Sequence, residues 1–373
     1  MEVLLENFNY ITWQMLVMWA IGGVLIYLAI AKEMEPTLLL PMGFGAILVN
    51  LPIAVPDTGV QHVLNTLFSI GIEGAELFPL MLFIGIGAMI DFTPLLTNPK
   101  LMIFGAAAQF GIFFTLAAAS LLGFEIQDAA SIAIIGAADG PTSIFVATEL
   151  GSKYLGAIMV AAYSYMALVP LVQPPIIKLC TTKAERKIKM QYKGKPVSKL
   201  TKILFPIVVT IIVGLVAPDA VALIGFLMFG NLIRECGVMS SISETAQNAL
   251  ANLITIFLGI TIASQMKASE FLQLDTLIII GLGLVAFVFD TFGGIMVAKI
   301  MNLFSKEKIN PMIGAAAISA FPMSARVVHK MGLEEDNQNF LLMHSIGVNV
   351  SGQIASVIAG GLILALVKAM IGG

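Results

Sequence analysis

Charged residues and cysteines are scarce in this chain of 373 residues. Asp, Glu, Lys and Arg together make up 12% of the sequence, whereas soluble globular domains contain about 25%. The net charge of −3 excludes the basic field that a nucleic-acid binder needs. Cys180 and Cys236 lie far apart and without metal-ligand spacing, so the sequence supports neither a disulfide framework nor a zinc site.

Several familiar catalytic motifs are also missing. The chain has no P-loop, HExxH, GxSxG or dinucleotide-binding fingerprint, each of which marks a particular chemistry or energy source. If the chain moves an ion, the energy must therefore come from a gradient or from chemistry that a partner supplies.

Hydrophobic residues fill most of the sequence. They make up 58% of it, and the mean hydropathy is +0.95, which excludes an ordinary soluble enzyme and a disordered chain. Twelve apolar segments follow one another from Trp13–Ile30 to Asn339–Met370. Since a membrane-spanning helix needs about 20 apolar residues, we expect an all-α, multi-pass membrane bundle with about ten to twelve crossings or half-crossings.

One stretch of the chain is strongly basic. Nine of the 20 Lys and Arg residues lie between Lys178 and Lys202. A short loop with this charge is expected to stay in the cytoplasm, and a patch for anionic lipid headgroups is the alternative interpretation. The loop, residues 178–202, separates a first transmembrane half, residues 1–177, from a second half, residues 203–373.

The two halves resemble each other weakly. Asn98-Pro99, Gly105-Ala-Ala-Ala, Gly123 and Ile135-Gly136 in the first half have counterparts in the second half at offsets of 209 to 212 residues. Coincidence in a chain rich in Gly and Ala is one explanation, and an internal repeat is the other. We favour two repeats related by inversion, because inverted repeats place a substrate or ion site at their interface near the membrane midplane.

Asp139 interrupts an apolar segment in Ile134-Ile-Gly-Ala-Ala-Asp139-Gly-Pro-Thr-Ser143. A carboxylate at membrane depth is costly and indicates a functional site. Pro141 lacks an N–H group and Gly140 lets the chain turn, so we expect a broken helix whose carbonyls lie beside Asp139 and the hydroxyl of Thr142. Such an oxygen cluster suits a small hard cation. The alternative is a surface loop in which Asp139 caps the next helix.

A second polar interruption, His344-Ser-Ile-Gly-Val-Asn349-Val-Ser-Gly-Gln353, lies at the equivalent place in the second half. We expect a broken segment here as well, in which Asn349, Ser351 and Gln353 complete the cation shell of Asp139. Polar contacts between helices are the alternative interpretation of these side chains.

A third candidate segment runs from Asn310 to Arg326 and includes Ser319. Arg326 is either a charge at the end of a span that extends to the membrane surface or a receptor for a planar carboxylate-like anion. The sequence alone leaves both interpretations open.

Four further residues are candidates of lower rank. Asp91 precedes Thr93-Pro94 and is expected to end a span, whereas Asp290 lies inside a long apolar run and could be a second intramembrane ligand or a proton carrier. Tyr163 and Tyr165 lie in the middle of a span. Buried tyrosine hydroxyls need partners, and one that faces Asp139 could transfer a proton; the alternative is a packing role.

These residues resemble those of a known family. Gly136-Ala-Ala-Asp139-Gly-Pro-Thr142, Tyr165, Asn310-Pro-x-x-Gly314, Ser319, Pro322-Met-x-x-Arg326 and the segment from Asn339 through His344 to Asn349 are similar to the β subunit of sodium-pumping, biotin-dependent decarboxylases. The similarity covers nearly the whole chain. Family members act on oxaloacetate, methylmalonyl-CoA, glutaconyl-CoA or malonate, and the short N-terminal region is closer to the acyl-CoA branch.

The resemblance implies a multisubunit complex in a bacterial cytoplasmic membrane. A carboxyltransferase subunit would move CO2 to biotin on a carrier subunit, and a small subunit would anchor the assembly; whether the chain also forms a homo-oligomer stays open. Carboxybiotin would be decarboxylated on this chain while Na+ moves outward and a proton is consumed. Asp139 would be the main Na+ ligand, with Asn349 opposite. Tyr165 would be a proton donor or a second ion-site residue. The region implicated in ion passage and carboxybiotin handling would include Asn310, Gly314, Ser319 and Arg326.

Physical reasoning is consistent with this mechanism. Moving one Na+ against ~100 mV costs ~2.3 kcal/mol, which a modestly exergonic decarboxylation can supply. Exchange of Na+ for H+ would keep the Asp139 carboxylate from being charged and unpaired in a low dielectric. The alternative function is a secondary transporter that exchanges Na+ or H+ for a small organic anion bound by Arg326, which repeats and broken helices fit equally well.

Overall fold

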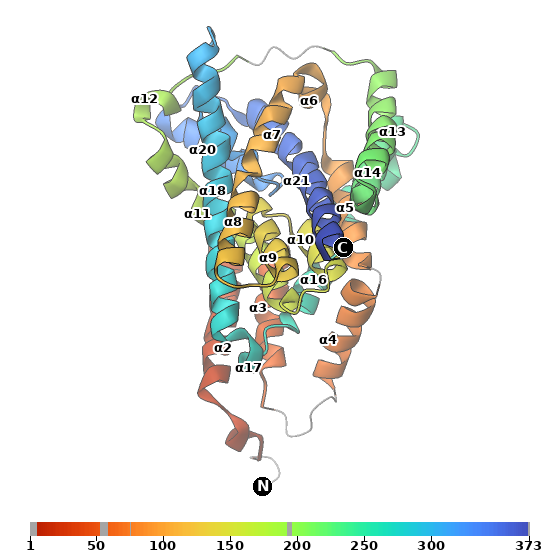
Figure 1. Cartoon of the computed structure of the whole chain (residues 1–373), viewed down its shortest axis with the longest axis vertical. Coiled ribbons are helices and arrows are strands. Elements are labelled where there is room, and N and C mark those ends of the chain that lie inside the picture. The colour runs from red at the N-terminus through yellow and green to blue at the C-terminus, as the bar shows by residue number, and fades with distance from the viewer. Residues whose placement is uncertain (1–5, 53–58, 75, 192–195, 372–373) are drawn as a thin grey trace.

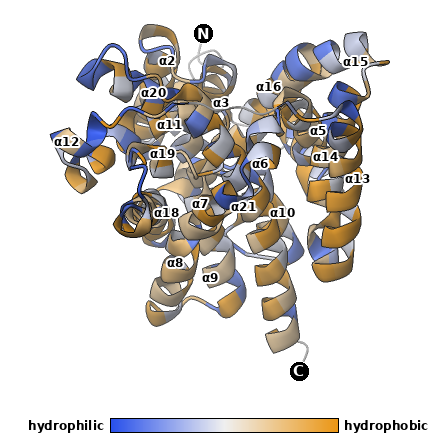
Figure 2. Cartoon of the chain, turned by 90° about the horizontal axis from the view of Figure 1, so that it is seen from above, coloured by the Kyte–Doolittle hydropathy of each residue, from blue (hydrophilic) through white to orange (hydrophobic). Residues whose placement is uncertain are grey.

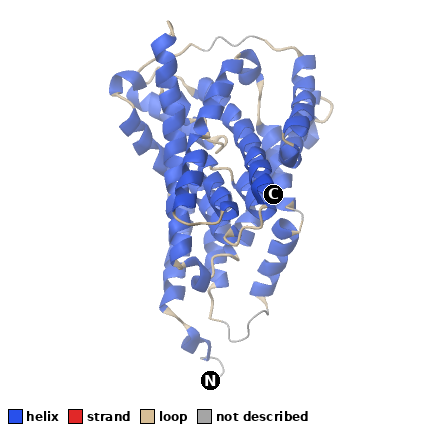
Figure 3. Cartoon of the chain, viewed as in Figure 1, coloured by secondary structure: helices blue, strands red, loops and turns tan. Residues whose placement is uncertain are grey.

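The computed structural model describes residues 6–52, 59–74, 76–191 and 196–371, and in these residues it contains helices and loops but no strand (Figure 3). Lys193 and Lys195 of the basic loop lie outside the described residues. The helices of the first half are α2 (Trp13–Ala31), α3 (Pro36–Val49), α4 (Val60–Phe68), α5 (Leu77–Met89), α6 (Thr93–Thr97), α7 (Met102–Ala108), α8 (Phe110–Leu121), α9 (Ile126–Ala133), α10 (Gly140–Glu149), α11 (Leu155–Cys180) and α12 (Lys183–Arg186).

The second half contains a similar set of long and short helices. They are α13 (Lys199–Val216), α14 (Val221–Cys236), α15 (Ser240–Thr245), α16 (Ala251–Ala263), α17 (Ala268–Phe271), α18 (Leu274–Phe304), α19 (Met312–Ala315), α20 (Met323–Glu335) and α21 (Leu342–Ile371). Short 3-10 or π segments join or extend them: η1 (Glu6–Tyr10), η2 (Ser69–Glu73), η3 (Pro99–Leu101), η4 (Ile134–Ala137), η5 (Pro218–Ala220) and η6 (Ala246–Leu250).

The helices form a membrane bundle, as the sequence predicts. Within the described part of the chain, seven helical segments are long and apolar enough to span a bilayer: Trp13–Ala31, Pro99–Leu121, Leu155–Cys180, Lys199–Val216, Ser240–Ala263, Leu274–Phe304 and Leu342–Ile371. An eighth span results if the pair Val60–Glu73 and Leu77–Met89, bent by 63°, crosses as one unit. The other predicted crossings correspond to shorter helices such as α3 and α14.

Apolar side chains on the outside of the bundle are suited to lipid. Only 11% of the span formed by α13 is buried, and Ile211, Leu215 and Val216 are exposed on it. Figure 2 shows α13 as an almost entirely hydrophobic helix at one edge of the molecule. Helices suit this environment because they satisfy every backbone hydrogen bond internally.

The bundle has two distinct ends (Figure 1). The N-terminus and α4 lie at one end, and α6, α12 and the start of α13 lie at the other. The described part of the basic loop is therefore at the second end. By the charge rule for short loops, this is the end that the sequence predicts to face the cytoplasm.

The prediction of a broken segment at Asn349 is wrong. α21 runs without interruption from Leu342 to Ile371 and carries Asn349 in its first third. This segment contains glycines and polar residues but no proline, so every residue keeps its N–H group for the helix. Glycine is common in membrane helices and does not break them by itself.

The second half is interrupted elsewhere, between α19 and α20. Residues 316–322 are not helical and end at Pro322. The backbone N–H of Ser319 in this stretch donates to the carbonyl of Ala137 in η4, at 2.9 Å. The two interrupted stretches therefore lie in direct contact, while the inverted relation of the two halves stays a prediction.

Candidate functional site

The chain turns at Asp139 because of its local sequence. α9 passes into η4, Ala138 adopts a left-handed conformation with φ 52°, and Asp139 is extended. Pro141 then lies in the first turn of α10, where its missing N–H costs no helical hydrogen bond. η4 therefore ends before Asp139, and Asp139 is the N-cap of α10. It is, however, buried, with 3% of its surface exposed, so this is not a surface loop.

The Asp139 carboxylate accepts hydrogen bonds from three side chains. The Thr142 hydroxyl donates to Oδ2 at 2.8 Å, the Ser356 hydroxyl at 2.8 Å and the Gln353 amide at 3.1 Å. The Thr142 backbone N–H adds a longer contact of 3.3 Å to Oδ1. Two of the side chains come from α21, so the site joins the first half of the chain to the second.

The unbroken helix α21 explains which of its polar residues reach Asp139. Asn349, Gln353 and Ser356 are spaced i, i+4 and i+7 and so share one helix face. The Asn349 amide donates to the carbonyl of Ile318 at 2.7 Å, and its Oδ1 has no partner among the described residues. Ser356 is a member of the site that our sequence analysis missed, and its i+7 spacing from Asn349 is the signal that could have found it.

Ser351 does not belong to this face. It lies two residues from both Asn349 and Gln353, about 200° around the helix from each. Its hydroxyl donates to the carbonyl of Val348 at 2.6 Å, and its backbone carbonyl packs against Gly105 on α7. The expectation that Ser351 joins the cation shell depended on a break at Asn349, and the continuous helix contradicts it.

Ser319 lies next to the Asp139 turn, and Asn310 lies away from it. The Ser319 hydroxyl donates to the carbonyl of Gly352 at 3.1 Å, while its backbone holds Ala137 in η4. Asn310 instead binds the basic segment, because its amide donates to the carbonyls of Arg186 and Ile188, both at 2.9 Å. Asn310 therefore fixes the basic segment at the end of the bundle where that segment lies.

An ion pair fixes the same segment to α20. Arg186 Nε donates to Glu335 Oε1 at 2.6 Å. This hydrogen bond from Arg186 holds the pKa of Glu335 below its usual range. Arg326 is on the same helix α20 but is exposed, so it is accessible from outside the chain and does not line the buried site.

The two tyrosines of α11 have different surroundings. The Tyr165 hydroxyl donates to the carbonyl of Ile280 at 2.5 Å, which directs it toward α18. Tyr163 is fully buried, and its ring occupies the space that a side chain at Gly140 would fill. Its hydroxyl has no hydrogen-bond partner in the described part of the chain. Tyr163 is thus the tyrosine that packs directly against the Asp139 turn.

The other two predicted carboxylates lie outside this cluster. Asp91 follows the end of α5 and accepts hydrogen bonds from the backbone and hydroxyl of Thr93, as expected for the end of a span. Asp290 is fully buried in α18, and its Oδ1 accepts from the backbone N–H of Gly111 at 2.6 Å.

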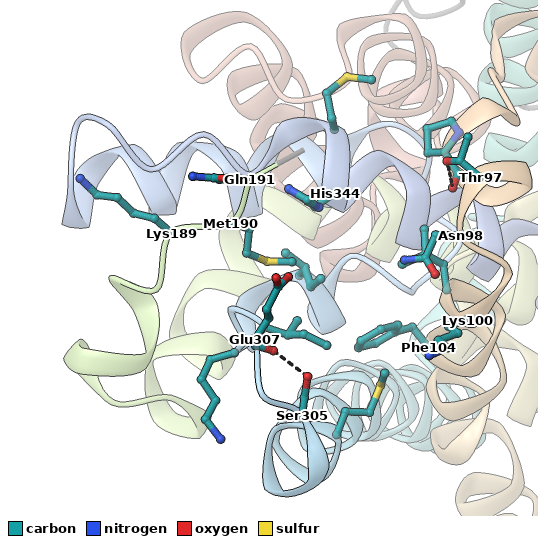
Figure 4. Close-up of a pocket in the computed structure, with 17 residues that line it drawn as sticks. Thr97, Asn98, Lys100, Phe104, Lys189, Met190, Gln191, Ser305, Glu307 and His344 are labelled. Carbon is teal, nitrogen blue, oxygen red and sulfur yellow. Dashed lines mark hydrogen bonds between the residues drawn. The ribbon is translucent and has the colours of Figure 1, made fainter. Parts of the chain in front are cut away.

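A pocket of about 860 Å3 opens beside the basic segment (Figure 4). Its polar lining includes Lys100, Lys189 and Lys308, and Phe104 and Ile313 give it apolar walls. His344, at the start of α21, also lines it (Figure 4). Because α21 rises about 1.5 Å per residue, Asn349 lies about 7.5 Å along the helix from the pocket. A pocket volume of about 860 Å3 is typical of small-molecule sites.

Comparisons with known proteins match the chain over nearly its whole length. The family model of the β subunit of Na+-transporting oxaloacetate decarboxylase matches residues 14–367. The chain is 49% identical to the β subunit of methylmalonyl-CoA decarboxylase from Propionigenium modestum, over 94% of each chain. It is 49% identical to the β subunit of glutaconyl-CoA decarboxylase from Acidaminococcus fermentans, over 97% of this chain and 96% of the relative. Identity to the oxaloacetate decarboxylase β chain of Haemophilus ducreyi is 45%, over 97% of each chain.

Proposed function

Because this chain belongs to the family of membrane β subunits of Na+-transporting decarboxylases, we propose that it decarboxylates carboxybiotin and couples this step to outward Na+ transport, with consumption of a proton. The family and the apolar helices make it a decarboxylase subunit and a multi-pass bacterial membrane protein. The observation that carries the proposal is the buried Asp139 carboxylate, which is surrounded by hydroxyl and amide groups from both halves of the chain.

We assign the complex to an acyl-CoA substrate such as methylmalonyl-CoA or glutaconyl-CoA. The alignments with the acyl-CoA decarboxylase subunits extend over 352 to 375 residues, close to the 373 residues of this chain. Those with the oxaloacetate decarboxylase chains extend over 412 to 422 residues. The longer alignments indicate that the oxaloacetate decarboxylase chains contain inserted segments that this chain lacks.

Asp139 is the group that binds Na+ and H+ in turn. The hydroxyls of Thr142 and Ser356 donate to its carboxylate, and a hydroxyl can instead offer its lone pairs to a cation. Asn349 contributes an amide oxygen on the same face of α21 as Gln353 and Ser356. Na+ or H+ neutralises Asp139, which avoids a buried, unpaired charge.

The segment from Asn310 to Ser319 links the cytoplasmic pocket to the ion site. Ile313 lines the pocket, and Ser319 binds both the Asp139 turn and α21. The biotin arm, carried by a partner subunit, enters this pocket, where lysine ammonium groups attract its carboxylate. Arg326, exposed on α20, receives the carboxybiotin as it approaches. Tyr165, which lies on α11, is the proton donor of our proposal.

The partners that this function requires are a biotin carrier subunit, a carboxyltransferase subunit and a small membrane-anchor subunit. The first supplies carboxybiotin, the second loads it from the acyl-CoA, and the third holds the assembly at the membrane. The nine basic residues of segment 178–202 favour a docking side in the cytoplasm.

Co-reconstitution in liposomes tests the proposal. The chain and its biotin carrier are supplied with carboxybiotin, and CO2 release and radiolabelled Na+ uptake are followed together, with and without avidin. We expect Na+-dependent CO2 release and coupled Na+ uptake, both blocked by avidin. Na+ uptake that depends on neither carboxybiotin nor avidin would instead identify a secondary transporter.

A further inference from the structure

Asp290 is a buried carboxylate to which the mechanism above gives no role. It lies in the middle of α18, fully buried. No Lys, Arg or His forms an ion pair with it in the described part of the chain. An ionisable side chain inside a membrane-spanning helix costs free energy, so its presence indicates a functional role.

One oxygen of Asp290 supports an interrupted helix. The span of residues 99–121 is interrupted at Gln109, where α7 ends and α8 begins. The first N–H groups of a helix have no partner within the helix. Asp290 Oδ1 accepts from two of them, Gly111 N–H at 2.6 Å and Ile112 N–H at 3.3 Å. Asp290 therefore caps α8 from a different helix.

The other oxygen faces the turn that carries Asp139. A Cβ atom on Gly136 in η4 would lie 2.7 Å from Asp290 Oδ2 and 2.5 Å from the Cβ of Ala286. Glycine is therefore required at position 136 for this close approach. Asp290 Oδ2 has no hydrogen-bond partner among the described residues, so its contact with η4 is one of packing.

η4 leads directly into the ion site. Gly136 precedes Asp139 by three residues, and the carbonyl of Ala137 between them accepts from Ser319 N–H. α18 thus supports η4 through packing at Gly136, and the interrupted stretch 316–322 holds it through a hydrogen bond at Ala137. The position of the Asp139 carboxylate relative to Gln353 and Ser356 on α21 depends on both supports.

We propose that Asp290 is a positioning residue for the ion site, which fixes the start of α8 and the η4 turn against α18 so that Asp139 meets its partners on α21. The inference rests on the proposed function, since it takes Asp139 as the Na+ site. Asp290 acts through the hydrogen bonds that its Oδ1 accepts and through the packing of its side chain against η4, and not through a bound ion of its own.

The test measures Na+ binding to the assembled complex. Na+-dependent protection from thermal unfolding gives the half-saturating Na+ concentration, and Na+-dependent CO2 release gives the same quantity together with the maximal rate. Asp290→Ala removes the acceptor and leaves two buried N–H groups without a partner, so we expect half-saturation to rise at least about tenfold. The maximal rate at saturating Na+ changes much less, because the reacting groups remain in place.

Asp290→Asn separates the acceptor from the charge. The amide oxygen of Asn can accept from Gly111 and Ile112, so half-saturation is expected to stay within about threefold of wild type. If Asp290→Asn is as defective as Asp290→Ala, the charge itself is required and the positioning role is overturned. The matched control is Thr291→Val, which changes the neighbouring buried side chain, whose hydroxyl is unpartnered in the described part of the chain; it should bind Na+ like wild type.

Gly136→Ala tests the contact from its other side. The added Cβ would overlap both Ala286 and Asp290 and so moves η4 away from α18, and half-saturation should rise here as well. Unchanged Na+ binding in Gly136→Ala would refute the inference. If wild type shows no Na+ protection at all, the proposed function fails instead.

Discussion

Replacement of Ser356 by Ala is the sharpest test of the ion site. The Ser356 hydroxyl lies 2.8 Å from Asp139 Oδ2 and is fully buried, so water cannot replace it. A hydrogen bond to a charged group contributes about 1.5–3 kcal/mol, and every 1.4 kcal/mol corresponds to about tenfold in affinity. If the hydroxyl is a ligand in the Na+ state, the variant should need roughly 10- to 150-fold more Na+ for half-maximal CO2 release.

The expected sign of the effect separates two roles of Ser356. A hydroxyl that only stabilised the ion-free carboxylate would, when removed, leave Na+ binding unchanged or make it tighter. Ser351→Ala is the matched control, because Ser351 lies on the opposite face of α21 and donates to Val348. Both variants are assayed for Na+-dependent CO2 release and Na+ uptake in liposomes. An equal shift in the two variants, or none in Ser356→Ala, would refute the geometry of the site.

Three further predictions concern the surroundings of the site. Arg326→Ala should reduce turnover of carboxybiotin at least about tenfold without changing Na+ protection from thermal unfolding; intact turnover would remove the receptor role. Gly140→Ala should destabilise the chain by about 1–3 kcal/mol, since its Cβ overlaps the Tyr163 ring; a melting temperature like that of wild type would contradict this packing. The pKa of Glu335 is lowered by Arg186, so the stabilisation of the basic segment should be present above the ordinary Glu pKa of about 4.3 and be lost as the pH falls through the lower pKa in the folded chain. Hydrogen exchange in residues 181–191 should therefore accelerate below that range. Glu335→Gln should weaken this pH dependence, and the Lys189–Asp336 ion pair retains part of it.

The sequence predicted the parts of the structure that depend on local chemistry. The apolar runs correspond to helices, such as Trp13–Ala31 for the predicted Trp13–Ile30. The interruption at Asp139 follows from Gly140 and Pro141, whose backbone effects are local. The pairing of Asp139 with α21 followed from the proposed repeat, and Gln353 confirms that contact.

The errors in the prediction concern long-range geometry. Polar residues and glycines suggested a break at Asn349, but without a proline the helix continues, and this continuity moves Ser351 off the site and brings Ser356 onto it. Residues 316–322 interrupt the third candidate segment instead, and Pro322 marks the end of this interruption. The rotation of α11 about its axis decides which of its tyrosines packs against Gly140. Apolar periodicity does not predict this rotation, because most faces of the helix are hydrophobic.

The buried carboxylates of Asp139 and Asp290 differ in the kind of donor that surrounds them, and this difference predicts opposite outcomes of the same substitution. The short contacts of Asp139 come from hydroxyl and amide side chains, which can also present oxygen lone pairs. Asp290 is held by backbone N–H groups, which can only donate.

A site of the first kind can exchange a cation for a proton, whereas a site of the second kind serves as a fixed cap. Asp139→Asn should therefore abolish Na+ uptake and Na+-dependent CO2 release, because the amide cannot carry the charge that binds Na+. Asp290→Asn should retain both. The two variants, measured side by side with complex assembly as the control, would refute this argument if Asp139→Asn pumped at the native rate or if both lost transport alike.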